Sequence, residues 1–181
     1  NTYSAWVVYA NPEGLGPEDL SGVRPGAGTR LDRWALSRLQ GTVATVIEHM
    51  DAYDCTHAGR AIAAYVDELS NWYVRLSRRR FWDGEPAAFA TLRHCLVEVA
   101  KLIAPFTPFL ADEIYANLIA GAAELDDSVH LRDFPEPDAP VPDLYFRTVG
   151  MATKPRRMHS AAARPTSDAS LGWSRTPGTG T

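Results

Sequence analysis

Apolar residues recur at three- and four-residue intervals in four stretches of the chain, a spacing that is typical of amphipathic helices. The stretches cover about residues 31–53, 57–79, 86–104 and 107–120. Only a few residues separate each stretch from the next, and such short connections favour antiparallel neighbours. The pattern predicts an all-α fold, an up-down antiparallel helical bundle.

Residues that favour helix ends stand at several of these boundaries. Thr29 can cap the first helix, and Asp32 three residues later forms an acidic variant of the capping box. Pro86 fits the first turn of the third helix, and Pro105 ends it. Gly121 is a natural C-cap for the fourth helix.

The remaining segments have a different character. Residues 1–10 resemble the end of an incoming helix, and residues 11–28 form a linker dense in Gly and Pro. A short extended segment is expected at 127–131. Residues 144–181 are rich in Arg, Pro, Ser, Thr and Gly without apolar periodicity, which predicts disorder. We therefore expect a linker (1–28), a bundle (29–143) and a disordered C-terminal tail (144–181).

The chain shows no targeting signal. No run approaches the roughly 20 apolar residues of a membrane span, and the N-terminus has no secretory signal. The first residue is not Met, which suggests a piece cut from a longer protein. The two cysteines lie far apart in sequence, which indicates a reduced, cytoplasmic protein.

Charge is distributed unevenly along the chain. The net charge is −4, but residues 1–143 hold 12 basic and 21 acidic residues, whereas residues 144–181 hold 6 and 1. An acidic body does not by itself indicate nucleic-acid binding. Any contact with a polyanion therefore needs a local basic patch.

One such patch lies at residues 70–82, which read SNWYVRLSRRRFW. On a helical projection Asn71, Arg75 and Arg78 face away from the apolar side, Arg79 lies at the border, and Trp72 and Leu76 point inward. The arginines suit either of two roles. They can stabilise the helix C-terminus and pair with nearby acids, or they can bind phosphate oxygens.

The two residues that follow, Phe81 and Trp82, also leave two interpretations open. They can cover the end of the bundle or stack on an unpaired base.

Other candidate chemistry is weak. Cys55 with His57, and His94 with Cys95, supply zinc-ligand types, but their spacing fits no common zinc site. Neither cysteine stands in the electropositive setting that a nucleophile needs. We expect no metal and no catalytic residue in this chain.

The patch resembles the bundle signature of isoleucyl-tRNA synthetases, in residues 71–75 and 77–82. Residues 102–115, which contain Pro-Phe-Thr-Pro-Phe, are similar to a motif shared with related class I synthetases, including the valyl and leucyl enzymes. Residues 31–39 and 128–131 also fit, in the expected order, and residues 1–4 with 9–11 look like the exit from the catalytic domain. The resemblance covers roughly residues 1–138.

The resemblance implies a tRNA-binding, anticodon-binding bundle. Its parent enzyme would join isoleucine to tRNA through an isoleucyl-adenylate, with ATP and Mg²⁺. The ATP-binding motifs of that enzyme are absent here, so no cofactor is expected in this chain. The expected partners are tRNA and the catalytic and editing domains of the same parent chain, in a cytoplasmic monomer.

Residue roles follow from the patch and the resemblance together. Arg75, Arg78, Arg79 and Arg80 are predicted to contact tRNA phosphates, with Asn71 assisting. Six residues are predicted to form the structural core: Trp34, Leu69, Trp72, Tyr73, Leu102 and Phe109.

Two alternatives remain open. One is a protein-interaction bundle without an RNA role, using Phe81 and Trp82 as an apolar anchor. The other is the equivalent domain of a valyl or leucyl enzyme. Residues 144–181 depart from the family, and a wrong reading frame or an artificial gene end is a hypothesis that resequencing the coding DNA would test.

Overall fold

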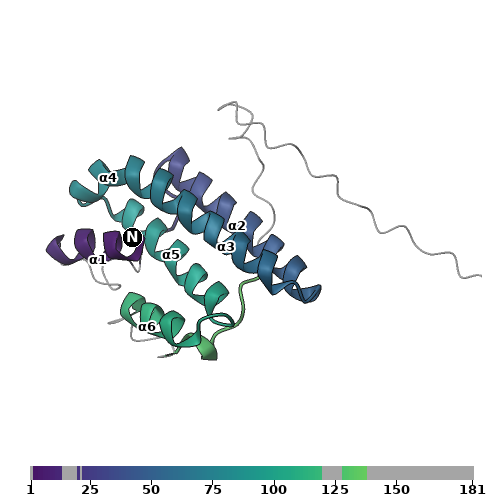
Figure 1. Ribbon diagram of the computed structural model, residues 1–181. Coiled ribbons are helices and arrows are strands. Elements are labelled where there is room, and N and C mark those ends of the chain that lie inside the picture. The colour runs from purple at the N-terminus through teal and green to yellow at the C-terminus, as the bar shows by residue number, and fades with distance from the viewer. Residues whose placement is uncertain (1, 14–19, 21, 120–127, 138–181) are drawn as a thin grey trace, which may run out of the picture.

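The computed structural model describes residues 2–13, 20, 22–119 and 128–137 (Figure 1). The elements are helices α1 (Thr2–Glu13), α2 (Arg30–Asp51), α3 (Cys55–Glu68), the π-helix η1 (Leu69–Val74), α4 (Arg75–Trp82), α5 (Pro86–Ile103), α6 (Pro108–Ile119) and the 3₁₀ turn η2 (Val129–Leu131). The described part of the chain contains no strand, and the predicted all-α bundle is confirmed.

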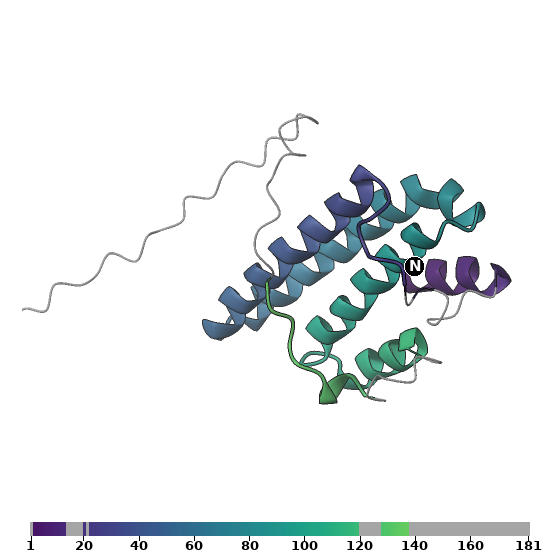
Figure 2. The same cartoon turned by 180° about the vertical axis from the view of Figure 1, so that it is seen from behind.

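The helices α2 and α3 form a long antiparallel hairpin, and α5 packs against both (Figures 1 and 2). The helix α6 returns along α5, while α1 lies across the end of the bundle where α4 and the start of α5 meet. The α3, η1 and α4 elements follow one another without a break, so the predicted second helix is one continuous helical run.

The predicted helix ends agree with the structure to within a few residues. The Asp32 carboxylate accepts a hydrogen bond from the Thr29 backbone N–H at 2.6 Å, as the capping-box pattern predicts. Pro86 occupies the first turn of α5. Gly121 and the tail 144–181 lie outside the described residues.

An aromatic cluster fills the end of the core where α1, α4 and α5 meet. Phe89 lies at the centre, 5.9 Å from the Trp6 ring and 5.1 Å from the Phe81 ring, measured between centroids. The Tyr73 ring meets Phe81 edge-on at 6.2 Å. Such pairs stabilise by about 1 kcal/mol beyond the area they bury.

Four of the six predicted core residues pack in the bundle. Leu69, Tyr73 and Leu102 are buried, and Trp34 is half-buried against the core. The two others were predicted wrongly, because 43% of Trp72 and 91% of Phe109 are exposed.

The π-helix explains Trp72. In α3 the buried positions are Ala58, Ile62 and Tyr65, and the α-helical period would bring residues 72 and 76 to the same face. The wider turn of η1 holds one more residue, so the buried face continues through Tyr73, Val74, Ser77 and Phe81 instead. Trp72 and Leu76, both predicted to point inward, are turned outward.

Phe109 is exposed for a simpler reason. The face of α6 that packs on the bundle contains Ala111, Tyr115 and Leu118. At 100° per residue, Phe109 lies about 160° away from Ala111 around the helix, on the far side of the buried face.

The segment predicted as extended at 127–131 is also different. The described part forms the 3₁₀ turn η2, because the Asp112 carboxylate accepts hydrogen bonds from the Ser128 hydroxyl at 2.7 Å and from the Val129 N–H at 2.9 Å. These hydrogen bonds lower the pKa of Asp112. The turn is thereby attached to α6.

Within the described ranges, no helix is long and apolar enough to cross a membrane.

Candidate nucleic-acid interface

The arginine patch is attached to the bundle through a buried carboxylate. The Asp32 side chain, which is fully buried, accepts hydrogen bonds from both terminal nitrogens of Arg80, each at 2.8 Å. The Tyr73 hydroxyl donates to the same carboxylate at 2.7 Å. The start of α2 is therefore joined to η1 and to the end of α4, at one end of the bundle.

A second carboxylate completes this network. The Nε and Nη2 atoms of Arg80 donate to Glu85 at 2.7 Å each, so the guanidinium lies between two acids. Only 16% of the Arg80 side chain is exposed. The phosphate contact predicted for Arg80 is not supported, because both carboxylates would have to release it first.

The charges in this network stabilise one another. Burial alone would raise the pKa of Asp32, but hydrogen bonds from Arg80, Thr29 and Tyr73 outweigh burial and hold the pKa below its usual value. The hydrogen bond from Arg80 likewise lowers the pKa of Glu85. Both acids are thus anionic partners of Arg80 at neutral pH.

Gly28 allows the backbone to pass close to this network. A Cβ atom at Gly28 would contact the Asp32 carboxylate and would lie 2.8 Å from the Arg80 Nη2 atom. The loop before α2 is held by a further hydrogen bond, from the Gly26 N–H to the Thr91 hydroxyl at 3.1 Å.

The solvent side of α4 carries the other arginines. Arg75, Arg78 and Arg79 are all exposed, and 93% of the Arg79 side chain is accessible. Together with Leu76, Trp82 and Asp83 they line a shallow groove of about 580 Å³, which we call the α4 groove. Arg79 pairs with Asp83 at 3.6 Å, and both side chains are exposed, so the pair stabilises little.

Asn71 lies one turn before this groove but does not line it. Its side-chain amide donates a hydrogen bond to Asp67 at 2.8 Å. The assisting role predicted for Asn71 stays a prediction.

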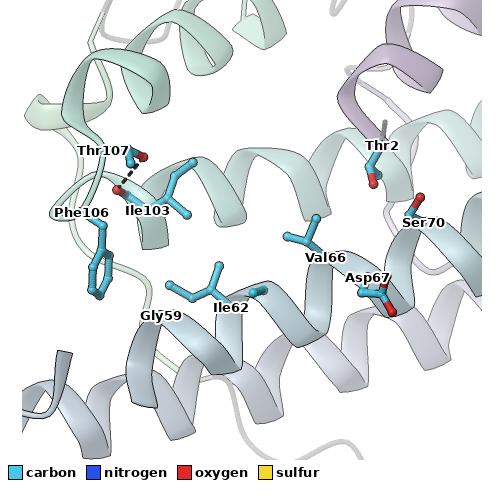
Figure 3. Close-up of a pocket in the computed structure, with 10 residues that line it drawn as sticks. Thr2, Gly59, Ile62, Val66, Asp67, Ser70, Ile103, Phe106 and Thr107 are labelled. Atoms are coloured by element: carbon cyan, nitrogen blue, oxygen red, sulfur yellow. Dashed lines mark hydrogen bonds between the residues drawn. The ribbon is translucent and has the colours of Figure 1, made fainter. Parts of the chain in front are cut away.

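A second hollow, of about 530 Å³, is lined by Asp67 and no other charged side chain among the described residues (Figure 3). The hollow lies between α3 and the end of α5, and its walls are mostly apolar, with Ile62, Val66, Ile103 and Phe106. Without a cation in its lining it does not suit a phosphate. The α4 groove is therefore the better candidate for a polyanion.

The cysteines lie apart from both hollows. Cys55 is exposed and Cys95 is buried, where burial raises the pKa of its thiol to about 12. In the part of the chain that the structure covers, no three His, Cys, Asp or Glu side chains come together in a way that could hold a metal ion.

Comparison with known proteins agrees with this geometry. The family described as the anticodon-binding domain of tRNA ligase matches residues 32–159. The chain belongs to this family. The match includes α2 from Asp32 onward, the whole helical run with the α4 groove, α5 and α6. It extends past residue 143, and the domain boundaries drawn from the sequence stay a prediction.

Similarity to individual proteins points to one kind of tRNA ligase within this family. The chain is 47% identical over 140 residues to an isoleucine–tRNA ligase of Bacillus thuringiensis (strain Al Hakam), which covers 75% of the chain and 13% of the relative. It is 46% identical over 151 residues to that of Dehalococcoides mccartyi (strain ATCC BAA-2266 / KCTC 15142 / 195), covering 79% of the chain and 14% of the relative. For the Streptomyces coelicolor ligase the identity is 43% over 142 residues, covering 76% and 13%. The chain thus spans about one seventh of the length of these relatives.

The sequence predicted that Asp32 caps α2, but sequence reasoning missed its ion pair with Arg80. A signal was present, because Asp32 lies three and seven residues before the buried Ala35 and Leu39 and so shares their face of α2. A buried acid needs a cationic partner. The sequence alone did not show that this partner is Arg80, 48 residues away.

Proposed function

We propose that this chain is the tRNA-binding part of an isoleucine–tRNA ligase, and that the α4 groove contacts tRNA phosphates through Arg75, Arg78 and Arg79. The observation that carries the proposal is the gathering of three exposed guanidinium groups on one groove of an acidic body. Arginine forks suit phosphate oxygens, and the weak Arg79–Asp83 pair leaves the groove open to an anion.

The reaction itself belongs to the rest of the parent protein. We infer that the parent charges tRNA with isoleucine using ATP and Mg²⁺, since the relatives are isoleucine–tRNA ligases. In that arrangement the bundle supplies affinity and orientation for tRNA. The monomeric state and the cytoplasmic location stay predictions.

A salt titration tests the RNA contact. Binding of an isoleucine tRNA to the 181-residue chain is expected to weaken steeply with salt, because each phosphate contact releases counterions. Arg78→Glu and Arg79→Glu are each expected to weaken binding and to reduce the slope of log affinity against log salt by about 1.

Arg60→Glu is the matched control. Arg60 is exposed on α3, about 22 Å before Arg75 along the helical run, and does not line the groove. This variant is expected to leave the slope unchanged. Salt-independent binding, or equal effects of all three reversals, would count against the α4 groove.

The protein-interaction alternative is less well supported, because Phe81, one of the two residues predicted to form its apolar anchor, is buried in the aromatic cluster. The valyl and leucyl alternatives are less well supported than the isoleucyl one, given the identity of 43–47% to isoleucine–tRNA ligases. Comparing the affinity of the chain for isoleucine and valine tRNAs tests the remaining choice.

A further inference from the structure

The hydroxyl of Thr2 is a buried polar group with no hydrogen-bond partner among the described residues. Thr2 is the first residue of α1, and only 4% of it is exposed. Buried hydroxyl groups are normally hydrogen-bonded, because burial removes the water that would otherwise bind them. The Thr2 hydroxyl therefore calls for a contact that the described part of the chain does not supply.

Other threonines of this fold show which partner such a hydroxyl takes. The hydroxyl groups of Thr42, Thr45 and Thr91, all inside helices, each donate to the carbonyl oxygen four residues earlier, at 2.9, 3.0 and 2.8 Å. For Thr2, the residue four positions earlier would precede Asn1. The same hydrogen bond forms at Thr2 if α1 continues upstream by at least one turn in a longer chain.

The second hollow, which was described above, begins where that continuation would start. Thr2 lies at one end of it, and Figure 3 shows Phe106 and Gly59 at the other end. One wall follows the helical run from Gly59 to Ser70, which is about 16 Å, or roughly three turns of helix. A Cβ atom at Gly59 would meet nothing within 4 Å. The hollow therefore has the length of a three-turn helix that ends at Thr2.

The walls of the hollow suit the apolar face of a helix. Ile62 and Val66 of α3 face Ile103 and Phe106 at the end of α5, and small residues on α3 let another backbone come close. We propose that α1 is the last part of a longer helix in the parent protein, and that its upstream turns pack into this hollow through apolar side chains.

An upstream segment is favoured over a separate partner because it is covalently attached at Thr2. Such a tether gives a segment a high effective concentration at the groove, without any second molecule. The inference rests on the proposed function only in taking this chain as part of a longer parent, as its coverage of 13–14% of the relatives supports.

The test compares the 181-residue chain with the same chain extended by the 12 residues that precede Asn1 in the parent. Far-ultraviolet circular dichroism is expected to show about 12 additional helical residues in the extended chain, since the hollow has room for roughly three turns. Ala63→Gln places a polar amide in the hollow. It is expected to lower the melting temperature of the extended chain by roughly 2–10 °C and to leave that of the 181-residue chain nearly unchanged.

Ala64→Gln is the matched control. Ala63 and Ala64 are adjacent exposed alanines of α3, but Ala64 does not line the hollow. The control is expected to leave the melting temperature of both chains nearly unchanged.

Thr2→Val gives a second comparison, in which the sign is expected to differ between the two chains. In the extended chain the variant loses a hydrogen bond and melts at a lower temperature. In the 181-residue chain it replaces an unpartnered buried hydroxyl with a methyl group and melts at a slightly higher temperature.

Three outcomes would overturn the inference. One is an extension that adds no helix, and another is an equal effect of Ala63→Gln and Ala64→Gln in the extended chain. The third is a melting temperature of the 181-residue chain that rises with protein concentration and loses this dependence in Ala63→Gln, which would assign the hollow to a second copy. None of these outcomes bears on the α4 groove, because tRNA binding tests that proposal separately.

Discussion

Asp32 shows how much one buried carboxylate can organise. It caps α2 through the Thr29 backbone, and it receives hydrogen bonds from Arg80 and Tyr73 on elements more than 40 residues away in sequence. The single hydroxyl proton of Tyr73 is shared between Asp32 and the Ala88 carbonyl oxygen, which lies 3.1 Å from the hydroxyl oxygen at the start of α5. The negative charge therefore lies where three helices meet, and its loss affects all of them.

Replacing this charge gives a pH-dependent prediction. Since the folded-state pKa of Asp32 lies below its unfolded value of 3.8, the unfolded chain binds the proton more readily. The stabilisation by Asp32 is present above that value and is lost as the pH falls through the folded pKa. Urea unfolding of Asp32→Asn at pH 7 is expected to show a loss of about 3 kcal/mol, which shrinks toward pH 3.

Glu85 contributes in the same direction, because Arg80 lowers its pKa as well. The Asp32→Asn variant therefore keeps part of the acid sensitivity of the wild type. A loss of stability of the same size at pH 3 and pH 7 would show that the charge of Asp32 is not what stabilises the fold.

Replacing Asp83 is expected to strengthen RNA binding, whereas the arginine reversals are expected to weaken it. Its carboxylate lies in the α4 groove beside Arg79 and repels phosphates. Asp83→Asn removes that charge from an exposed position without touching the core, and it is expected to tighten RNA binding a few-fold at low salt. The gain should fade at high salt, where surface charges are screened. Filter binding at two salt concentrations measures it, and weaker binding by the variant would contradict the assigned polarity of the groove.

At the scale of the elements, two glycines in and before α2 make a matched pair. Gly41 lies inside α2, and a Cβ atom there would meet nothing within 4 Å. Gly41→Ala is therefore expected to stabilise the fold by roughly 0.5–1 kcal/mol, because alanine favours the helix. Gly28→Ala is expected to destabilise it by about 1–3 kcal/mol, since the added methyl would collide with Asp32 and Arg80.

Thermal unfolding of both variants measures the contrast. Equal shifts of the melting temperature in one direction would show that the loop can move away from Arg80 at little cost.

The elements also show where sequence reasoning succeeds. The helix boundaries were predictable because Thr29, Asp32, Pro86 and Pro105 act on their own backbone within a few residues. The π-helix was not predictable, since no residue type in Leu69–Val74 marks an i→i+5 turn. Its effect on Trp72 and Leu76 was therefore missed. Asp32 and Arg80 each showed a local signal, but only the fold shows that the two residues meet.

At the scale of the whole molecule, the arginine that stabilises the fold is paired with acids, whereas the arginines that are proposed to bind RNA are exposed. The acids at the start of α2 and α5 take up Arg80, while the arginines on the outer side of α4 stay exposed in a body of negative net charge. The bundle thus presents a small cationic groove on its surface. This arrangement suits the tRNA contact proposed above, in a chain that spans about one seventh of the length of its relatives.

The rotation of 100° between successive residues of α4 has a consequence for substitution tolerance. Arg79 extends into solvent, so any flexible cation of similar length can take its place. Arg80 makes two-nitrogen contacts with each of two acids, a geometry that the single ammonium of lysine cannot reproduce. Although Arg79 and Arg80 are neighbours in one motif, Arg79 is therefore expected to tolerate replacement by another cation, whereas Arg80 is not.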